Sequence, residues 1–175
     1  SKEELVLLNQ QKISLTDDVL VIADDDKPLA IAGIMGGLES SVTDKTQRIF
    51  LESAFFTPHL IAGKARRFGL HTDSSQRFER GVDPALAEIA LERATQLLIQ
   101  IVGGHVGPII RQDHLQFLPT SREINLKIEK LNAALGMLFS SEQVTNLLQS
   151  IGMMVEKINA QELKVSVPSY RFDIY

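Results

Sequence analysis

One segment of the chain limits the possible folds more than any other. The sequence features of one long helix are all present in residues 83–104, DPALAEIALERATQLLIQIVGG. Asp83 is a suitable N-cap, Pro84 suits the first helical position, and the pair Gly103-Gly104 is a typical stop. Apolar residues recur at helical spacing and predict one stripe that packs on a core: Leu86, Ile89, Ala90, Ala94, Leu97, Leu98 and Ile101. Such a helix separates the chain into a part before it and a part after it.

The part before the helix favours β-structure. Residues 19–24, 29–37 and 48–56 are apolar, β-branched runs, and the turn signal DDKP separates the first two. Thr57 is a plausible N-cap with Pro58 after it, and the apolar spacing predicts one short helix that stops at Gly69.

The part after the helix changes character around residue 118, and a domain boundary there is the simplest interpretation. A strand is expected at residues 124–128, a helix from about Glu129 to Leu135, and a capped helix at 140–152. Two short strands around a turn, like a wing, are expected after residue 152.

Composition narrows the class of protein. A hydrophobic share of 44% and a charged share of 23% are typical of a soluble globular protein. A net charge of −4 restricts any RNA contact to a local basic patch. The absence of cysteine excludes disulfides, thiolate zinc sites and thiol nucleophiles, and it suits a reducing, cytoplasmic compartment. No apolar run is long enough to span a membrane. No signal-like start is present. The chain lacks an initiating Met and stops just after an apolar, strand-like run, so it is expected to be an excised piece of a longer protein.

Two features in the β-rich part invite a functional interpretation. Glu52 interrupts the apolar run IFLESAFF, so it either faces solvent by strand alternation or is a buried acceptor for a ligand hydroxyl. Gly33, Gly36 and Gly37 in AGIMGG do not match a dinucleotide motif. They indicate either a plain turn or close approach of the backbone to a ligand.

Other polar residues carry less information. Asp24, Asp25 and Asp26 predict a solvated turn rather than a cation site. The four histidines, His59, His71, His105 and His114, have no metal-ligand spacing, and no nucleophile–base pair is visible.

The segment RRFGLHTDSSQRFERG, residues 66–81, gathers four arginines around a run of small hydroxyl residues. Arg66, Arg67, Arg77 and Arg80 could contact the phosphates and bases of an RNA end. The alternative is that they pair with Asp73, Glu79 and Asp83 and only brace the segment.

Taken in order, GIMGG, LESAFF, GKARRFGLHTDSSQRFERGVDPAL, ERATQLL and GGHVGPI closely resemble the β subunits of bacterial phenylalanyl-tRNA synthetases. The resemblance covers nearly the whole chain and implies an α+β fold. Residues 1–117 would be most of an editing domain, a β-sandwich of unusual topology with flanking helices. Residues 118–175 would begin a small, C-terminally truncated, winged-helix-like α/β module.

The resemblance also implies a function. Enzymes of this family join phenylalanine to tRNA(Phe) with ATP and Mg²⁺ as (αβ)₂ heterotetramers, and their editing domain hydrolyses mischarged tyrosyl-tRNA(Phe). No protein nucleophile is implied, because water is held by pocket groups and the tRNA end. The alternatives are a non-editing structural or RNA-binding module of the same subunit and a free-standing tRNA deacylase.

Site residues follow from the matched motifs. The resemblance implies that Glu52 recognises the tyrosine hydroxyl, that Gly36 and Gly37 let the backbone approach the substrate, and that Thr72 lines the pocket. Ser74 stands where the family commonly has Ala, and a Pro and a His that lie upstream in the family are absent from this chain.

The resemblance further suggests tRNA contacts and a metal ligand. His71 lies in the arginine-rich segment, among the possible tRNA contacts. Asp173 matches a magnesium ligand of the full enzyme, but one carboxylate cannot hold the ion, so neither a metal nor another cofactor is expected in this chain.

Overall fold

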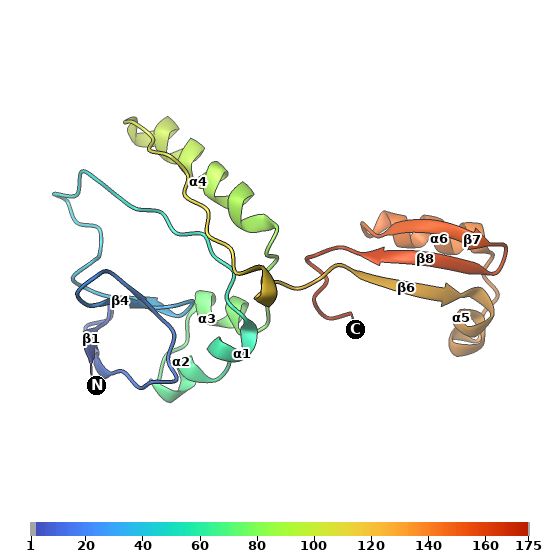
Figure 1. Cartoon of the computed structure of the whole chain (residues 1–175), viewed down its shortest axis with the longest axis horizontal. Helices are drawn as coiled ribbons and strands as arrows, with labels where there is room; N and C mark the ends of the chain where they lie inside the picture. The colour runs from blue at the N-terminus through green and yellow to red at the C-terminus, as the bar shows by residue number, and fades with distance from the viewer. Residues whose placement is uncertain (1–2, 175) are drawn as a thin grey trace. The chain divides into compact units, whose positions relative to one another are not determined.

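The computed structural model describes residues 3–174, in two compact units: residues 1–118 and residues 119–175. Each unit has a hydrophobic core of its own, and each is described separately. The strands of the described residues form three small antiparallel sheets, and the helices are mostly short (Figure 1). The fold is therefore mixed α/β, as the α+β prediction requires at the coarse level.

The first unit begins with two small sheets that share one core. β1 (Glu4–Val6) pairs with β2 (Lys12–Ser14), and β4 (Pro28–Ile31) pairs with both β3 (Val21–Ala23) and β5 (Met35–Gly36). A bridge between Leu7 and Gly37 joins the two sheets. Their apolar side chains pack on the following helices, and the buried cluster consists of Leu5, Leu7, Ile13, Leu15, Ile31, Ile34, Ile61, Ala65 and Leu70.

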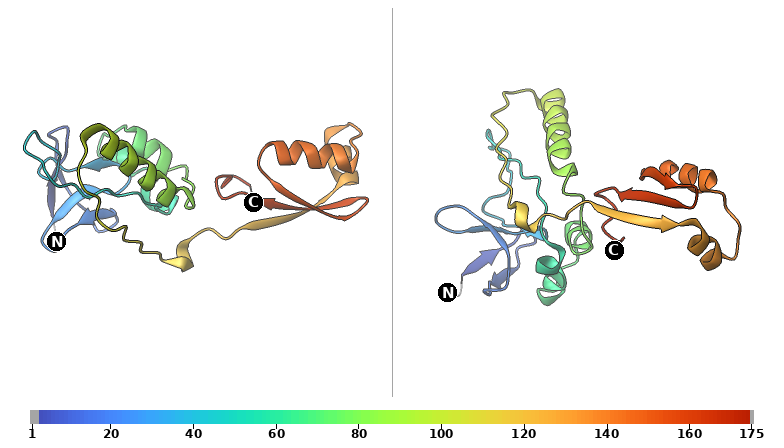
Figure 2. Two further views of the ribbon diagram at one scale, coloured as in Figure 1. Left: turned by 90° about the horizontal axis from the view of Figure 1, so that it is seen from above. Right: turned by 45° about the vertical axis from the view of Figure 1, so that its right-hand side comes forward.

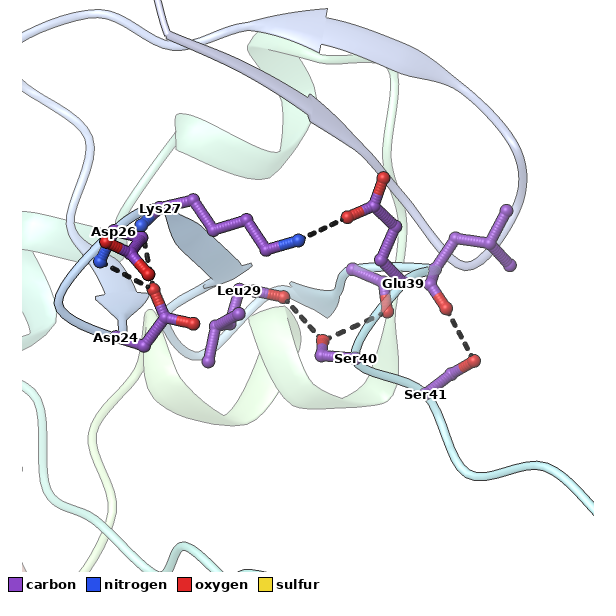
Figure 3. A network of polar contacts seen from close by, with 9 residues as sticks. Asp24, Asp26, Lys27, Leu29, Glu39, Ser40 and Ser41 are labelled. Atoms are coloured by element: carbon purple, nitrogen blue, oxygen red, sulfur yellow. Dashed lines mark hydrogen bonds and ion pairs between the residues drawn. The ribbon is translucent and has the colours of Figure 1, made fainter. Parts of the chain in front are cut away.

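The predicted turn at residues 24–26 is confirmed. The Asp24 carboxylate accepts hydrogen bonds from the backbone N–H groups of Asp26, at 2.9 Å, and of Lys27, at 2.7 Å (Figure 3). Lys27 in turn forms an ion pair with Glu39, beyond β5. This exposed turn connects β3 to β4, and its hydrogen bonds satisfy backbone groups that the strands cannot.

Two of the expected strands differ in the structure. Residues 29–37 are not one strand, because they fold back at the turn formed by Ala32, Gly33 and Ile34 between β4 and β5. Residues 48–56 form no strand at all. A β-branched run predicts the strand conformation, but a strand also needs a hydrogen-bonded neighbour, and no described segment supplies one here.

The helix expected from Thr57 to Gly69 is two short helices, α1 (Pro58–Ile61) and α2 (Lys64–Arg67). Gly63 breaks them apart in the left-handed region, with a φ of 76°. Helix α3 (Asp73–Phe78), which the apolar pattern does not predict, follows shortly after.

The long helix exists as α4 (Leu86–Val102), but it begins later than predicted. Asp83 still caps a backbone group, because its carboxylate accepts the N–H of Ala85 at 2.9 Å, within a turn before the helix. Gly103 ends the helix as predicted.

The expected packing of the α4 stripe is wrong for the described chain. No residue of α4 is buried, and Ile89 and Ile101 are 61% and 77% exposed. The extended segment after Gly104 runs back beside the helix, where Arg111 contacts Glu88 at 3.1 Å (Figures 1 and 2). Within residues 3–174 the stripe is only partly covered: Ala94 and Leu98 are half-buried, while the apolar residues toward both ends of the helix are exposed. The 3₁₀ turn η1 (Leu115–Phe117) closes the unit.

The second unit follows the predicted element order. β6 (Arg122–Lys127) leads into α5 (Ile128–Leu135), then α6 (Ser141–Ser150), and the hairpin of β7 (Met154–Asn159) and β8 (Glu162–Val167) follows. β8 lies between β6 and β7. One face of the sheet packs on the helices through a buried cluster of Ile128, Val144, Met153, Leu163 and Val165.

Helix α6 starts with a capping box, in which Ser140 and Gln143 exchange hydrogen bonds between side chain and backbone at 2.9 and 3.2 Å. This confirms the predicted start, and Gly152 follows the end of the helix. The hydroxyl of Tyr170 donates to the carbonyl of Ile151 at 3.0 Å, which ties the last described segment to the end of α6.

Candidate functional site

The glycine motif, LESAFF and the arginine-rich segment meet at one small contact in the first unit. A Cβ placed on Gly33 would lie 3.1–3.2 Å from side-chain atoms of Phe78 in α3 and Phe56 from LESAFF. The two phenylalanine rings themselves lie 5.2 Å apart between centroids. The turn of Ala32, Gly33 and Ile34, called the glycine turn below, is therefore a neighbour of both the end of LESAFF and helix α3. Segments that line one pocket have to be neighbours in this way.

Thr72 is the N-cap of helix α3 and also its link to the glycine turn. Its hydroxyl accepts the N–H of Ser75 at 3.0 Å and donates to the carbonyl of Ile34 at 2.8 Å. Two of the three hydrogen-bonding positions of the hydroxyl are thus used within the protein, including its only proton. What remains for a ligand is one acceptor lone pair.

Ser75 is the site residue that sequence reasoning missed. It is the buried polar residue of the described chain, 4% exposed, and its hydroxyl donates to the carbonyl of Thr72 at 2.9 Å. The same hydroxyl accepts the N–H of Thr72 at 3.2 Å, which completes a capping box. The threonine–serine spacing of a capping box was the available signal, although a serine at its last position is less usual than Glu or Gln.

Gly36 and Gly37 lie at the end of the hairpin, but their surroundings differ. A Cβ on Gly37 would lie 2.5 Å from the carbonyl oxygen of Leu29, to which the Gly37 N–H donates at 2.8 Å. The Ser40 hydroxyl also donates to that oxygen, at 3.1 Å (Figure 3). A Cβ on Gly36 would only touch the Leu8 side chain, at 3.4 Å. Close packing of the backbone explains Gly37, whereas Gly36 has room.

Glu52 lies in an extended segment without strand pairing, and its side chain reaches the surface. Nevertheless the protein around its carboxyl raises the pKa of Glu52 by desolvation. Within residues 3–174 no hydrogen bond or ion pair stabilises this carboxylate. Glu52 is thus an exposed residue whose carboxylate is partly desolvated and has no protein partner among the described residues.

The four arginines divide into two groups. The Arg67 guanidinium binds the Asp18 carboxylate through two hydrogen bonds, at 2.8 and 3.1 Å, and it also donates to the Thr16 hydroxyl at 2.9 Å. Lys64 pairs with the same carboxylate. These hydrogen bonds, first from Arg67 and then from Lys64, hold the pKa of Asp18 well below its usual range.

The other three arginines are exposed and point to no acid. Arg80 donates only to the carbonyl of Gln76, at 3.2 Å, and the described residues provide no hydrogen-bond or ion-pair partner for Arg66 or Arg77. The expected ion pairs with Asp73, Glu79 and Asp83 are therefore wrong. The only one of the four that braces the fold, Arg67, does so through Asp18.

The residues named for a metal do not form a metal site here. Asp173 pairs with the guanidinium of Arg171 at 3.1 Å, which lowers the pKa of its carboxyl. In the part of the chain that the structure describes, no three His, Asp or Glu side chains are grouped to hold an ion. A single carboxylate that is already paired with Arg171 does not fit a magnesium site.

A surface hollow of about 450 Å³ lies in the second unit, between helix α5 and the turn before β8. It contains none of the predicted site residues, and its lining consists of Glu129, Asn132, Ala133, Gly136, Met137, Leu138 and Gln161.

Across the described residues, no helix is both long and apolar enough to cross a membrane.

In comparisons with known proteins, each of the two units contains a match to a family model. Residues 1–103 match the family model described as the B3/4 domain. The chain belongs to the B3/4 domain family. After this B3/4 domain, residues 124–175 match the model of the tRNA synthetase B5 domain.

Curated relatives extend the match to the whole chain. The sequence is 53% identical, over 175 residues, to the phenylalanine–tRNA ligase β subunit of Francisella tularensis, covering 99% of this chain and 22% of that protein. It is 53% identical to the same subunit of Acinetobacter baylyi and 51% identical to that of Pseudomonas putida, covering 99% and 98% of this chain and again 22% of each relative. The chain thus spans about a fifth of the length of the relatives it matches.

Proposed function

We propose that residues 1–117, which include the B3/4 match at residues 1–103, form the editing region of a phenylalanine–tRNA ligase β subunit and that this region hydrolyses mischarged tyrosyl-tRNA(Phe). The observation that carries the proposal is the meeting of GIMGG, LESAFF and helix α3 at Gly33, Phe56 and Phe78. Similarity to β subunits over the whole chain supports it.

The selectivity rests on a hydroxyl group. Tyrosine differs from phenylalanine by one hydroxyl, and an apolar synthetic pocket rejects such an isostere only about 10²-fold. In the editing site, Glu52 recognises the tyrosine hydroxyl. A partly desolvated carboxylate without a protein partner gains the most stabilisation from a ligand that donates a hydrogen bond to it. A phenylalanyl ester leaves Glu52 unpaired and is spared.

The remaining pocket residues shape the site without attacking the ester. Thr72 is no nucleophile, since its proton is held by the Ile34 carbonyl and, within the described residues, no base accepts it. Gly36 has the room that a substrate needs next to the backbone. Ser74 adds a hydroxyl where the family commonly has a methyl group. Hydrolysis then uses water oriented by pocket groups and by the tRNA end.

The tRNA end is held by the exposed cations of the same segment. Arg66, Arg77 and Arg80 offer guanidiniums to phosphates and stacked bases, and His71 lies beside them in the sequence. Arg67 takes no part in this contact, because its fork is already filled by Asp18 and Thr16.

Attachment of phenylalanine to tRNA(Phe) would belong to the full enzyme and not to this chain alone. We propose that the parent β subunit assembles with an α subunit into an (αβ)₂ heterotetramer in the cytoplasm, and that it attaches phenylalanine to tRNA(Phe) with ATP and Mg²⁺. Residues 118–175 are the start of a winged-helix-like module, which the strand–helix–helix–hairpin order of the B5 unit supports.

A second candidate is a scaffold that keeps the sequence without editing. The structural roles of Gly37 and Thr72 favour the scaffold. Close backbone packing is sufficient to explain a glycine at 37, and capping of α3 is sufficient to explain a threonine at 72.

Deacylation of tyrosyl-tRNA(Phe) by the full-length heterotetramer separates the two candidates. The wild-type enzyme is compared with Glu52→Gln, and Glu92→Gln on the exposed face of α4 is the control. Editing predicts hydrolysis by the wild type and the control, together with a loss of the preference for tyrosyl over phenylalanyl ester in Glu52→Gln. A wild-type enzyme that leaves the ester intact identifies a scaffold.

A further inference from the structure

Among the described residues, one hydrogen bond joins the start of helix α3 to the turn of Ala32, Gly33 and Ile34. That bond runs from the Thr72 hydroxyl to the Ile34 carbonyl, at 2.8 Å. The neighbouring contact of Gly33 with Phe78 and Phe56 is apolar and sets no direction. The orientation of the Thr72 side chain therefore decides how the two segments face each other.

Ser75 contacts Thr72 through two groups, its backbone N–H on the Thr72 hydroxyl and its own hydroxyl on the Thr72 backbone. The Ser75 hydroxyl donates to the Thr72 carbonyl at 2.9 Å and accepts the Thr72 N–H at 3.2 Å. The backbone N–H of Ser75 donates to the Thr72 hydroxyl at 3.0 Å. Because Ser75 is only 4% exposed, water cannot easily replace these bonds if the hydroxyl is removed.

We propose that Ser75 is a positioning residue of the editing pocket: it fixes Thr72 on the Ile34 carbonyl and so keeps the α3 segment and the glycine turn at one spacing. This inference rests on the proposed editing function and adds a residue to it. Ser75 touches no substrate, so its effect passes through Thr72 and the turn.

The consequence is a loss of rate rather than of affinity. Ser75 is buried and offers no group to the tRNA, whereas the reacting ester is sensitive to small errors of position in the pocket. Removal of the Ser75 hydroxyl breaks two hydrogen bonds, and we expect roughly a fivefold to tenfold fall in the rate of ester hydrolysis.

The test is tyrosyl-tRNA(Phe) hydrolysis by the full-length heterotetramer carrying Ser75→Ala. Gln143→Ala is the matched control, because it removes the last residue of the other capping box, at the start of α6 in the second unit. We expect Ser75→Ala to lower kcat about fivefold to tenfold with KM within about twofold, since positioning acts on the transition state. Gln143→Ala should edit at the wild-type rate, and both variants should charge phenylalanine normally.

Three outcomes would overturn the inference. Editing by Ser75→Ala at the wild-type rate shows that the capping box has no bearing on the pocket. An equal loss in Gln143→Ala assigns the effect to general stability. If only KM rises, Ser75 affects binding and not position. Glu52→Gln in the same assay keeps the two hypotheses apart: an effect of Glu52→Gln without one of Ser75→Ala refutes only this inference, whereas an inactive wild type refutes the editing function and this inference with it.

Discussion

At the scale of single residues, Gly36 and Gly37 are neighbours with different reasons for lacking a side chain. The Cβ of an alanine at 37 would collide with the Leu29 carbonyl, which belongs to the backbone of β4 and cannot rotate away. At 36 it would meet only the flexible Leu8 side chain at an ordinary distance.

We therefore expect Gly37→Ala to destabilise the first unit by about 1–3 kcal/mol, as overpacking typically does. Gly36→Ala should fold normally, and in the full enzyme it should slow tyrosyl-tRNA(Phe) hydrolysis by crowding the substrate. Urea unfolding of both variants checks the first expectation, and the deacylation assay checks the second. A stable Gly37→Ala protein would contradict the packing explanation.

Glu52 provides a second prediction at this scale. Desolvation raises its pKa in the folded state, so the folded protein binds this proton more tightly than the unfolded chain does. Wild-type stability is therefore unaffected by this group below its unfolded pKa of about 4.5, and it falls as the pH rises through the raised pKa.

Glu52→Gln does not titrate, so its advantage in Tm over the wild type should be small at pH 4 and larger at pH 7. Thermal unfolding of this chain across that range gives the answer. An advantage that shrinks as the pH rises would mean that a partner stabilises the carboxylate.

At the scale of elements, Gly63 separates helices α1 and α2. Its φ of 76° is costly for residues with a Cβ, although no atom lies near enough to clash with one. We expect Gly63→Ala to lose about 1 kcal/mol of stability through backbone strain alone.

Asparagine tolerates the left-handed region better than alanine does, so Gly63→Asn should lose less. Chemical denaturation of the two variants compares them directly. Equal losses would show that the backbone at residue 63 can relax and that one continuous helix is accessible.

How far the sequence predicts these elements depends on where their determinants lie. Local signals were sufficient for the Asp24 turn, the capped start of α6 and the hairpin of the second unit. They failed for residues 48–56, because pairing is decided by a partner strand, and for the α1–α2 break, because apolar spacing continues across Gly63. The candidate site divides in the same way: Glu52 and Thr72 come from motifs, whereas the Arg67–Asp18 pair joins residues distant in sequence, which no local pattern contains.

At the scale of the whole molecule, charge limits how this chain meets RNA. With a net charge of −4, the chain has no general attraction for phosphate, so the proposed tRNA contact depends on a local set of exposed cations.

Removing one guanidinium that contacts a phosphate should lower the slope of log Kd against log salt by about 0.7 for a single-stranded RNA end. We expect this for Arg66→Ala and Arg77→Ala in tRNA(Phe) binding by the full enzyme, and a smaller change for Arg67→Ala. A full change in Arg67→Ala alone would assign the tRNA contact to the wrong guanidiniums.

The partly exposed stripe of α4 has a practical consequence for anyone who handles this chain by itself. Exposed apolar surface of this kind binds fluorescent hydrophobic dyes and promotes association between copies. Purification at high concentration, or refolding from urea without dilution, should therefore yield soluble aggregates, and α4 is where solubilising substitutions such as Ile101→Lys belong.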